Sequence, residues 1–156
     1  MKKGIDAKAL VACLLIVYFI AFLGSLFTFN AVRSEWYISI RPSITPPNWV
    51  FPVVWNVLFL LIALSLYFSW TNSGKNEKAR IIAVFGINFL ANVLWSLLYF
   101  KMQNPLLAFY DIVVLLISIM LMIAVLWKIE KKSSLLLVPY FLWVSFASVL
   151  NYLSIM

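Results

Sequence analysis

The sequence contains no histidine and a single cysteine, Cys13. Without histidine it lacks the commonest metal ligand and the commonest general base. One cysteine can form neither an internal disulfide nor a cysteine-based metal site. No pairing of a nucleophile with a base is visible either, so hydrolytic and metal chemistry have no candidate constellation. The sequence therefore predicts no metal site and disfavours ordinary enzymology.

Charged residues are scarce as well. They make up 11% of the 156 residues, against about 25% in an average soluble domain, while 65% are hydrophobic. The mean hydropathy is +1.04. These values exclude a water-soluble fold. The 12 basic and 5 acidic residues stand between apolar runs, which is typical of membrane topology signals rather than of a nucleic-acid-binding surface. No nucleic acid partner is expected.

Five apolar runs are long enough to cross the bilayer, since about 20 residues of helix span about 30 Å of hydrocarbon. No strand-like alternation competes with them. We interpret the first run as a retained helix rather than a signal peptide, because Asp6 and Lys8 leave no apolar core before Cys13. We therefore predict an all-α fold in one domain, residues 1–156, with transmembrane helices at about 9–29, 49–70, 79–100, 105–127 and 135–156.

The basic residues also predict the orientation of the bundle. The first and third loops carry three, Arg33, Arg41 and Lys101. Because cytoplasmic segments carry the excess of Lys and Arg, we expect a multi-pass protein of the cell membrane with its amino terminus in the cytoplasm and its carboxyl terminus outside. The nine residues on the cytoplasmic side would be Lys2, Lys3, Lys8, Lys75, Lys78, Arg80, Lys128, Lys131 and Lys132.

The long connection is the first one, from Asn30 to Asn48, and the charge count places it on the outer face. Loops longer than about 12 to 15 residues are uncommon in compact domains and are usually functional or disordered. Aromatic residues and prolines argue against disorder here, and they predict a rigid lid over the helix ends. Asn48 is the expected N-cap of the second helix, which would start close to Trp49.

An aromatic ridge follows at the start of the second helix. Trp55 lies one turn after Phe51 and one turn before Phe59. A ligand-contacting role is favoured for Trp49 and Trp55, because the lid would cover them. For Trp36 and Tyr37 of the loop, a functional role and an interfacial aromatic belt are equal alternatives.

Polar and aromatic side chains form a stripe on the third helix and another on the fifth. Such stripes do not face lipid: they either hydrogen-bond helices together or line a polar cavity, and both alternatives stay open. The helical repeat places on one face of the third helix Asn88, Asn92, Trp95, Ser96 and Tyr99. It does the same on the fifth for Tyr140, Trp143, Ala147, Leu150 and Asn151.

Asp111 is the acid that stands inside an apolar run, that of the fourth helix. An ionised carboxylate at the bilayer centre costs roughly 2.5 to 3.5 kcal/mol. A hydrogen bond to a neighbouring helix is favoured over proton or ligand handling. Together these features predict a cavity lined by Trp, Tyr and Asn beneath the lid, suited to flat aromatic ligands because rings stack and indole N–H groups donate.

These residues resemble the translocator protein or tryptophan-rich sensory protein family, also called the peripheral-type benzodiazepine receptor family, and the chain looks like a bacterial member. The resemblance runs from the first loop to the last helix. Its motifs are Trp36-Tyr37, Pro42 and Pro46-Pro47-Asn48-Trp49 with Trp55; Asn92-Val93-Leu94-Trp95-Ser96 with Tyr99-Phe100; Asp111; and Pro139-Tyr140-Phe141-Leu142-Trp143 with Phe146-Ala147 and Leu150-Asn151-Tyr152.

The resemblance implies a five-helix bundle, commonly a homodimer in membrane lipid. It implies binding of tetrapyrroles such as protoporphyrin IX, of isoquinoline or benzodiazepine-like ligands and, in animal members, of cholesterol. It further implies light-dependent oxidative degradation of the porphyrin, for which Trp55 and Trp143 are the candidates. Carried over, the pocket comprises Trp49, Trp55, Asn92, Trp95, Trp143, Ala147 and Asn151, and the shared helix faces add Phe59, Tyr140 and Leu150.

Two departures narrow these expectations. Animal members have a basic residue after the aromatic one near the end of the fifth helix, whereas no basic residue follows Tyr152, which argues against cholesterol binding. The lack of histidine argues against a haem iron ligated by the protein, so a metal-free porphyrin fits better and no resident cofactor is expected. Arg33, Arg41 or Lys101 could pair with its propionates.

The sequence leaves open whether the protein is an enzyme. One alternative is transport or sensing of porphyrins and similar amphiphiles without chemistry, although five helices cannot form two equal inverted repeats. Another is a regulatory subunit that recognises a membrane protein. Small residues at a four-residue spacing, Ala79 with Ala83 and Gly24 with Thr28, favour close helix contact within the monomer, in a homodimer or with a partner.

Overall fold

The computed structural model describes residues 5–156 as a helical bundle. Within that range five helical stretches are long and apolar enough to cross a membrane, which confirms the predicted fold class: Ala7–Arg33, Val50–Asn72, Lys75–Lys101, Pro105–Ile129 and Lys131–Leu153. Lys2 and Lys3, which enter the charge count for orientation, lie outside the described residues.

The first three crossing helices are α1 (Ala7–Thr28), α3 (Val50–Asn72) and α4 (Lys75–Ser96). Helix α4 begins at Lys75, earlier than the expected residue 79. The carboxylate of Glu77 accepts a hydrogen bond from the Gly74 backbone N–H at 2.7 Å. This interaction satisfies one of the backbone donors at the helix start, so the polar turn becomes the first turn of the helix.

The last two crossings are α5 (Pro105–Ile129) and a broken helix made of α6 (Lys131–Leu136) and α7 (Val138–Leu153). The Asn104 side chain caps α5 by accepting from Leu107 N–H. The break falls at Leu137, two residues before Pro139. Proline has no N–H to donate to the carbonyl one turn earlier and its ring crowds that turn, so the fifth crossing consists of two consecutive helices.

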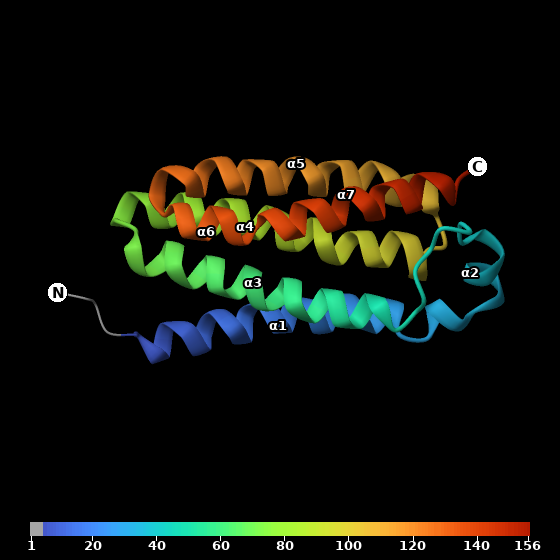
Figure 1. Ribbon diagram of the computed structural model, residues 1–156, viewed down its shortest axis with the longest axis horizontal. Coiled ribbons are helices and arrows are strands. Elements are labelled where there is room, and N and C mark those ends of the chain that lie inside the picture. Colours follow the sequence, from blue (N-terminus) through green and yellow to red (C-terminus); the bar gives the residue numbers. More distant parts are fainter. Residues whose placement is uncertain (1–4) are drawn as a thin grey trace.

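The five crossings form a ring of neighbours. Helix α1 packs against α3 and α4, α4 packs against α5, α5 packs against α6 and α7, and α3 closes the ring mainly through α6. The start of α1 and the α3–α4 and α5–α6 connections lie at one end of the bundle (Figure 1). The first loop, the α4–α5 connection and the carboxyl terminus lie at the other, which we call the lid end.

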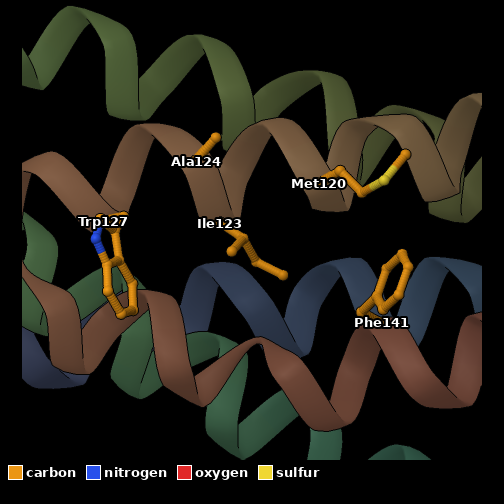
Figure 2. A pocket seen from close by; sticks show the side chains of 5 residues that line it. All are labelled: Met120, Ile123, Ala124, Trp127 and Phe141. Carbon is orange, nitrogen blue, oxygen red and sulfur yellow. The ribbon is translucent and has the colours of Figure 1, made fainter.

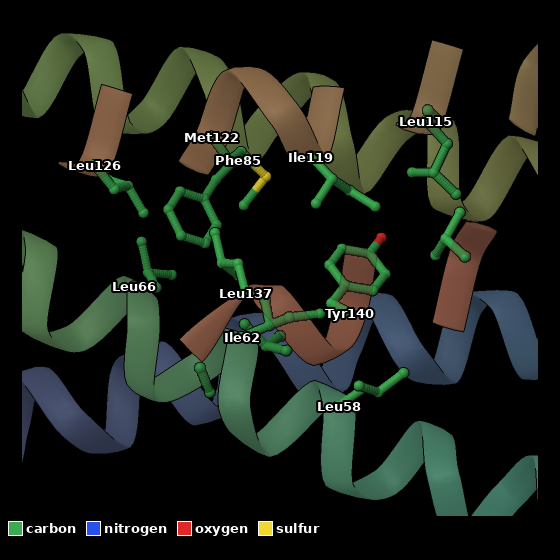
Figure 3. Close-up of a cluster of buried hydrophobic side chains, with 14 of the residues drawn as sticks. Leu58, Ile62, Leu66, Phe85, Leu115, Ile119, Met122, Leu126, Leu137 and Tyr140 are labelled. Carbon is green, nitrogen blue, oxygen red and sulfur yellow. The ribbon is translucent and has the colours of Figure 1, made fainter. Parts of the chain in front are cut away.

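A cluster of large apolar side chains fills the middle of the bundle and the end opposite the lid (Figure 3). Its central members come from α3, α4, α5 and α7 and are almost inaccessible, with Phe85 at 2% and Met122 at 0% exposure. Other residues drawn there are Leu58, Ile62, Leu66, Leu115, Ile119, Leu126, Leu137 and Tyr140. The lid half of the bundle holds instead most of the aromatic and amide side chains singled out from the sequence.

The first loop packs on the end of α4. It contains a short 3-10 turn (Ala31–Arg33) and helix α2 (Glu35–Ile40), capped by the Ser34 side chain. Tyr37 is buried and its ring lies 5.7 Å from that of Phe100, while Trp36 meets Tyr99 edge-on at 5.8 Å. Trp36 and Tyr37 therefore anchor the lid to the bundle. Burial raises the pKa of Tyr37, and the nearby Arg41 opposes that shift.

Candidate functional site

Four aromatic rings join α3 to α7 in the lid half of the bundle. Phe51 meets Trp143 edge-on with centroids 5.8 Å apart, and Trp55 meets Tyr140 at 6.1 Å. Phe59, one turn further along α3, stacks on Trp55 at 5.2 Å with an interplanar angle of 28°. Because the members lie four residues apart on α3 and three apart on α7, each helix presents them on one face. We call Phe51, Trp55, Tyr140 and Trp143 the aromatic ladder.

A groove of about 520 Å³ runs between the same two helices. Helix α3 packs closely on α6 but only lightly on α7, so the two helices separate toward the lid end. The volume lies within the roughly 300 to 1,000 Å³ of small-molecule sites. The residues that line this α3/α7 groove are Val53, Val54, Val57, Leu58, Pro139, Leu142, Trp143 and Phe146.

Trp143 belongs both to the aromatic ladder and to the α3/α7 groove, and its indole N–H has no hydrogen-bond partner among the described residues. Its Nε1 is also shielded from solvent. Buried donors are nearly always hydrogen-bonded, and a buried donor left without a partner costs about 1 to 3 kcal/mol of stability. Trp143 is therefore an unpaired donor beside the groove, and a molecule can accept from it only once the packing around Nε1 opens.

The amides of α4 are used differently. Asn88 donates to Ser118 Oγ of α5 at 2.9 Å and accepts from the Tyr140 hydroxyl of α7 at 3.3 Å. Asn92 donates to the same hydroxyl at 3.2 Å. Tyr140 is fully buried, so these bonds tie three helices together in the core. Of the two alternatives left open for this stripe, the structure shows hydrogen bonding between helices.

A second set of polar contacts lies nearer the lid. Trp95 Nε1 donates to Asn151 Oδ1 at 2.9 Å, and Asn151 Nδ2 donates to the Pro105 carbonyl at 2.8 Å. The Trp95 ring stacks on Tyr99 at 5.1 Å, and the Tyr99 hydroxyl lies 2.8 Å from Ser154 Oγ. Trp95 and Asn151 are therefore hydrogen-bonded to each other, and what Trp95 can offer a ligand is its ring surface rather than a donor.

Other predicted site residues fall in three environments. Trp49 is 68% exposed, which contradicts the expectation that the lid covers it. It is the N-cap of α3, one position beyond the expected Asn48, so its side chain stands at the exposed end of the helix. Ala147 is half-buried against the core cluster, and Leu150 is buried on the same helix.

Asp111 is buried, and its Oδ2 receives no hydrogen bond from any residue that the structure describes. The expected hydrogen bond to a neighbouring helix is not formed at that atom. The carboxyl lies on the inward face of α5 with Ala108 and Leu115, both apolar. The residues proposed to meet propionates, Arg33, Arg41 and Lys101, are all exposed.

Two features of the site could not be predicted from the sequence. Helix α4 continues directly into a π-helical turn, Leu97–Lys101, which carries the two rings that contact the lid, Tyr99 and Phe100. The pattern of residues there is that of an ordinary helix. Much of the wall of the α3/α7 groove is aliphatic, with residues such as Val57 and Leu142, which are indistinguishable in sequence from lipid-facing positions. Within residues 5–156 no cluster of three or more potential metal ligands occurs.

Comparison with known proteins gives consistent matches over almost the whole chain. A family model described as the TspO/MBR family matches residues 12–156. The tryptophan-rich protein TspO of Archaeoglobus fulgidus is 43% identical over 144 residues, 92% of either chain. The protein of that name from Chlorobaculum tepidum is 40% identical over 97% of this chain and 96% of its own. The translocator protein of Ovis aries is 28% identical over 84% of this chain and 79% of its own.

Proposed function

The chain belongs to the TspO/MBR family of membrane proteins, and from that premise we propose that it binds tetrapyrroles such as protoporphyrin IX along the aromatic ladder. Isoquinoline or benzodiazepine-like ligands would occupy the same place. The protein would act in the cell membrane with its amino terminus in the cytoplasm, and two copies would pair. Light would then drive oxidative degradation of the bound porphyrin.

The observation that carries this proposal is the environment of Trp143. Its buried Nε1 has no acceptor among residues 5–156, and its ring meets Phe51 beside a groove of about 520 Å³. The Trp143 and Phe146 rings on the groove wall can stack on a flat ligand, and a single well-placed donor fixes its orientation. A porphyrin supplies both partners, a large π-surface and carboxylate oxygens that accept.

The groove also suits an amphiphile that arrives through the membrane. Val57 is 54% exposed and Leu142 is 62% exposed, so its rim is open toward lipid. The apolar part of a porphyrin could enter between α3 and α7 while its propionates stay near the lid end. The exposed Arg33, Arg41 and Lys101 at that end are the candidates to pair with them.

The proposed chemistry is photo-oxidation with tryptophan as the donor. An excited porphyrin takes one electron from the indole of Trp55 or Trp143, leaving an indole radical cation and a porphyrin radical anion. The radical anion passes its electron to dioxygen, which becomes superoxide, and the neutral porphyrin then returns one electron to the indole radical cation. The resulting porphyrin radical cation combines with superoxide, so dioxygen is the oxidant that the degradation consumes. Trp55 is half-buried between Phe59 and Tyr140, which shields an indole radical from water, and Trp143 lies one rung away along the ladder.

The test is a tryptophan-quenching titration with protoporphyrin IX, followed by illumination of the complex in air. Trp143→Phe keeps a ring but removes the donor, and Trp55→Phe removes the second candidate. Trp70→Phe, at the opposite end of α3, is the matched control. If both Trp55→Phe and Trp143→Phe are quenched by protoporphyrin as strongly as the wild-type protein, the proposed site is wrong. Normal binding with unchanged bleaching in both variants would overturn the proposed chemistry and leave binding.

Transport or sensing without chemistry is the second candidate, and the open rim of the groove favours it. A ligand held between α3 and α7 can exchange directly with the bilayer, as a carrier or a sensor of amphiphiles requires. Flux of protoporphyrin into proteoliposomes at the rate of protein-free vesicles would exclude transport. Sensing would survive that result if the ligand still altered the pairing of chains in a cross-linking assay.

A further inference from the structure

A second groove, of about 530 Å³, lies between α5 and α7 and shares no residue with the first. In Figure 2 the side chains of Ile123 and Phe141 point into the space between the two helices, with Trp127 toward one end and Met120 toward the other. Ala124 completes the lining. We call this the α5/α7 groove, and the ligand proposed above has no role in it.

The groove extends from the headgroup level into the hydrocarbon. Trp127 lies in the last turn of α5, which ends at Ile129, and interfacial tryptophans mark the boundary between lipid and water. Met120 lies two turns deeper, roughly 10 Å along the helix. Every lining side chain is apolar apart from the indole N–H. A lipid acyl chain is the natural occupant of such walls.

Positive charge is concentrated where the groove meets the headgroups. The ammonium group of Lys131 lies 5.4 Å from the centroid of the Trp127 ring, and Lys128 and Lys132 flank it, both exposed. Glu130 is the acid in this segment, and its two oxygens accept from Asn72 Nδ2 at 3.0 Å and from the Lys132 backbone N–H at 3.1 Å. The carboxylate is thus held toward α3 and its own backbone.

The segment that carries these lysines is anchored to the bundle. Ser134 Oγ donates to the Ile123 carbonyl at 2.8 Å, which ties α6 to the wall of the groove. Ser65 of α3 donates to the Ser133 carbonyl at 2.8 Å. Both serines of α6 are buried. The lysines therefore stand at a defined place beside the groove rather than on a loose loop.

From these observations we propose that the α5/α7 groove binds an anionic phospholipid, with one acyl chain along Trp127, Ile123 and Met120 and the phosphate against Lys131. A zwitterionic lipid fits the same walls, but its own cation would meet three ammonium groups. The charge at the groove mouth selects the net-negative headgroup, because basic residues at the membrane surface attract anionic lipids.

The experiment uses the full chain in nanodiscs of phosphatidylcholine that contain a minor fraction of brominated lipid. Bromine quenches tryptophan at contact, and the difference between wild-type protein and Trp127→Phe isolates the signal of Trp127. We expect brominated phosphatidylglycerol to quench Trp127 at about a fivefold lower mole fraction than brominated phosphatidylcholine. This is the preference for an anionic lipid that one or two lysines at the membrane surface provide. Equal quenching by the two lipids would overturn the proposal.

Two sets of variants separate a built site from general surface charge. Lys128→Gln with Lys131→Gln should bring phosphatidylglycerol down to the level of phosphatidylcholine. Lys75→Gln with Lys78→Gln, at the same end of the bundle, should leave the preference intact, and an equal loss there would contradict a specific site. All four lysines lie at the ends of helices, so folding should persist, which the thermal transition of each variant checks.

Discussion

The two grooves are close in volume and in apolar lining, yet the structure gives them different chemistry. The α3/α7 groove includes the Trp143 indole, whose Nε1 is buried without an acceptor among the described residues, and this ring connects the groove to the aromatic ladder. The α5/α7 groove is bounded by the exposed Trp127, whose ring faces the ammonium group of Lys131. Cavity size and hydrophobicity do not identify a ligand; the few polar groups at the rim decide which acceptor, ring or headgroup fits.

Helix α7 separates the two grooves and contributes side chains to both: Phe141 lines the α5/α7 groove, and the α3/α7 groove is lined by Pro139, Leu142, Trp143 and Phe146. Their independence requires that this helix keep its position between them. Tyr140 attaches the helix to α4, because it is fully buried and hydrogen-bonded to both Asn88 and Asn92. Breaking that connection is therefore the strongest way to merge the two sites.

Tyr140→Ala should have the largest effect. It removes a fully buried ring and two hydrogen bonds, and truncation of a buried aromatic residue costs roughly 3 to 5 kcal/mol. We expect the free energy of unfolding in mild detergent to fall by about that amount and both ligands to bind more weakly. Tyr110→Ala, on the lipid-facing side of α5 with 62% exposure, is the control. Equal losses in the two variants would contradict the role of Tyr140.

Filling each groove in turn should separate the two sites. Val57→Trp adds a ring inside the α3/α7 groove and should weaken protoporphyrin binding about tenfold or more by overpacking, with the lipid preference unchanged. Ala124→Trp, in the α5/α7 groove, should weaken the lipid preference and leave protoporphyrin binding unchanged. Both positions are exposed to lipid, so folding should tolerate them. Quenching titrations with both ligands on both variants provide the measurement, and a loss of both ligands in either one would contradict independence.

Trp143→Phe should give a smaller and more specific effect. The ring contact with Phe51 remains, while the unpaired N–H disappears, so stability should stay the same or rise slightly. Affinity for protoporphyrin should fall about tenfold, the value of one hydrogen bond to a charged acceptor at about 1.5 kcal/mol. Thermal unfolding and quenching titration are measured on the same sample. A loss of stability with unchanged affinity would show that the indole N–H serves the fold.

The smallest expected effect concerns the lid. Burial raises the folded-state pKa of Tyr37 above the ordinary 10.0, so folding favours the neutral phenol. The stabilisation it contributes is complete below pH 10 and is lost as pH rises through the raised folded-state pKa. We expect the contact between α2 and the π-helical turn to weaken in that alkaline window, measured by hydrogen exchange of α2. Tyr37→Phe should abolish the pH dependence; an unchanged profile would assign it to another group.

The five crossings followed from sequence because their cause is local. Each stretch must satisfy its own backbone hydrogen bonds in hydrocarbon, so length and hydropathy are enough to predict a helix. The ends were less predictable, since they depend on single capping groups such as Glu77 before α4 and on Pro139 within the fifth crossing. The aromatic ridge and the two polar stripes were likewise visible, because the helical repeat alone decides which residues share a face.

What each face meets depended on how the helices pack. Trp95 and Trp143 look equivalent in sequence, yet Trp95 donates to Asn151 whereas Trp143 has no acceptor within residues 5–156. Trp49 was expected under the lid and is exposed. The pairing of Asn92 with Tyr140 joins residues far apart in the chain. Composition and periodicity determined the helices and their faces; distances between helices, which no local pattern encodes, decided which faces bind each other and which remain for a ligand.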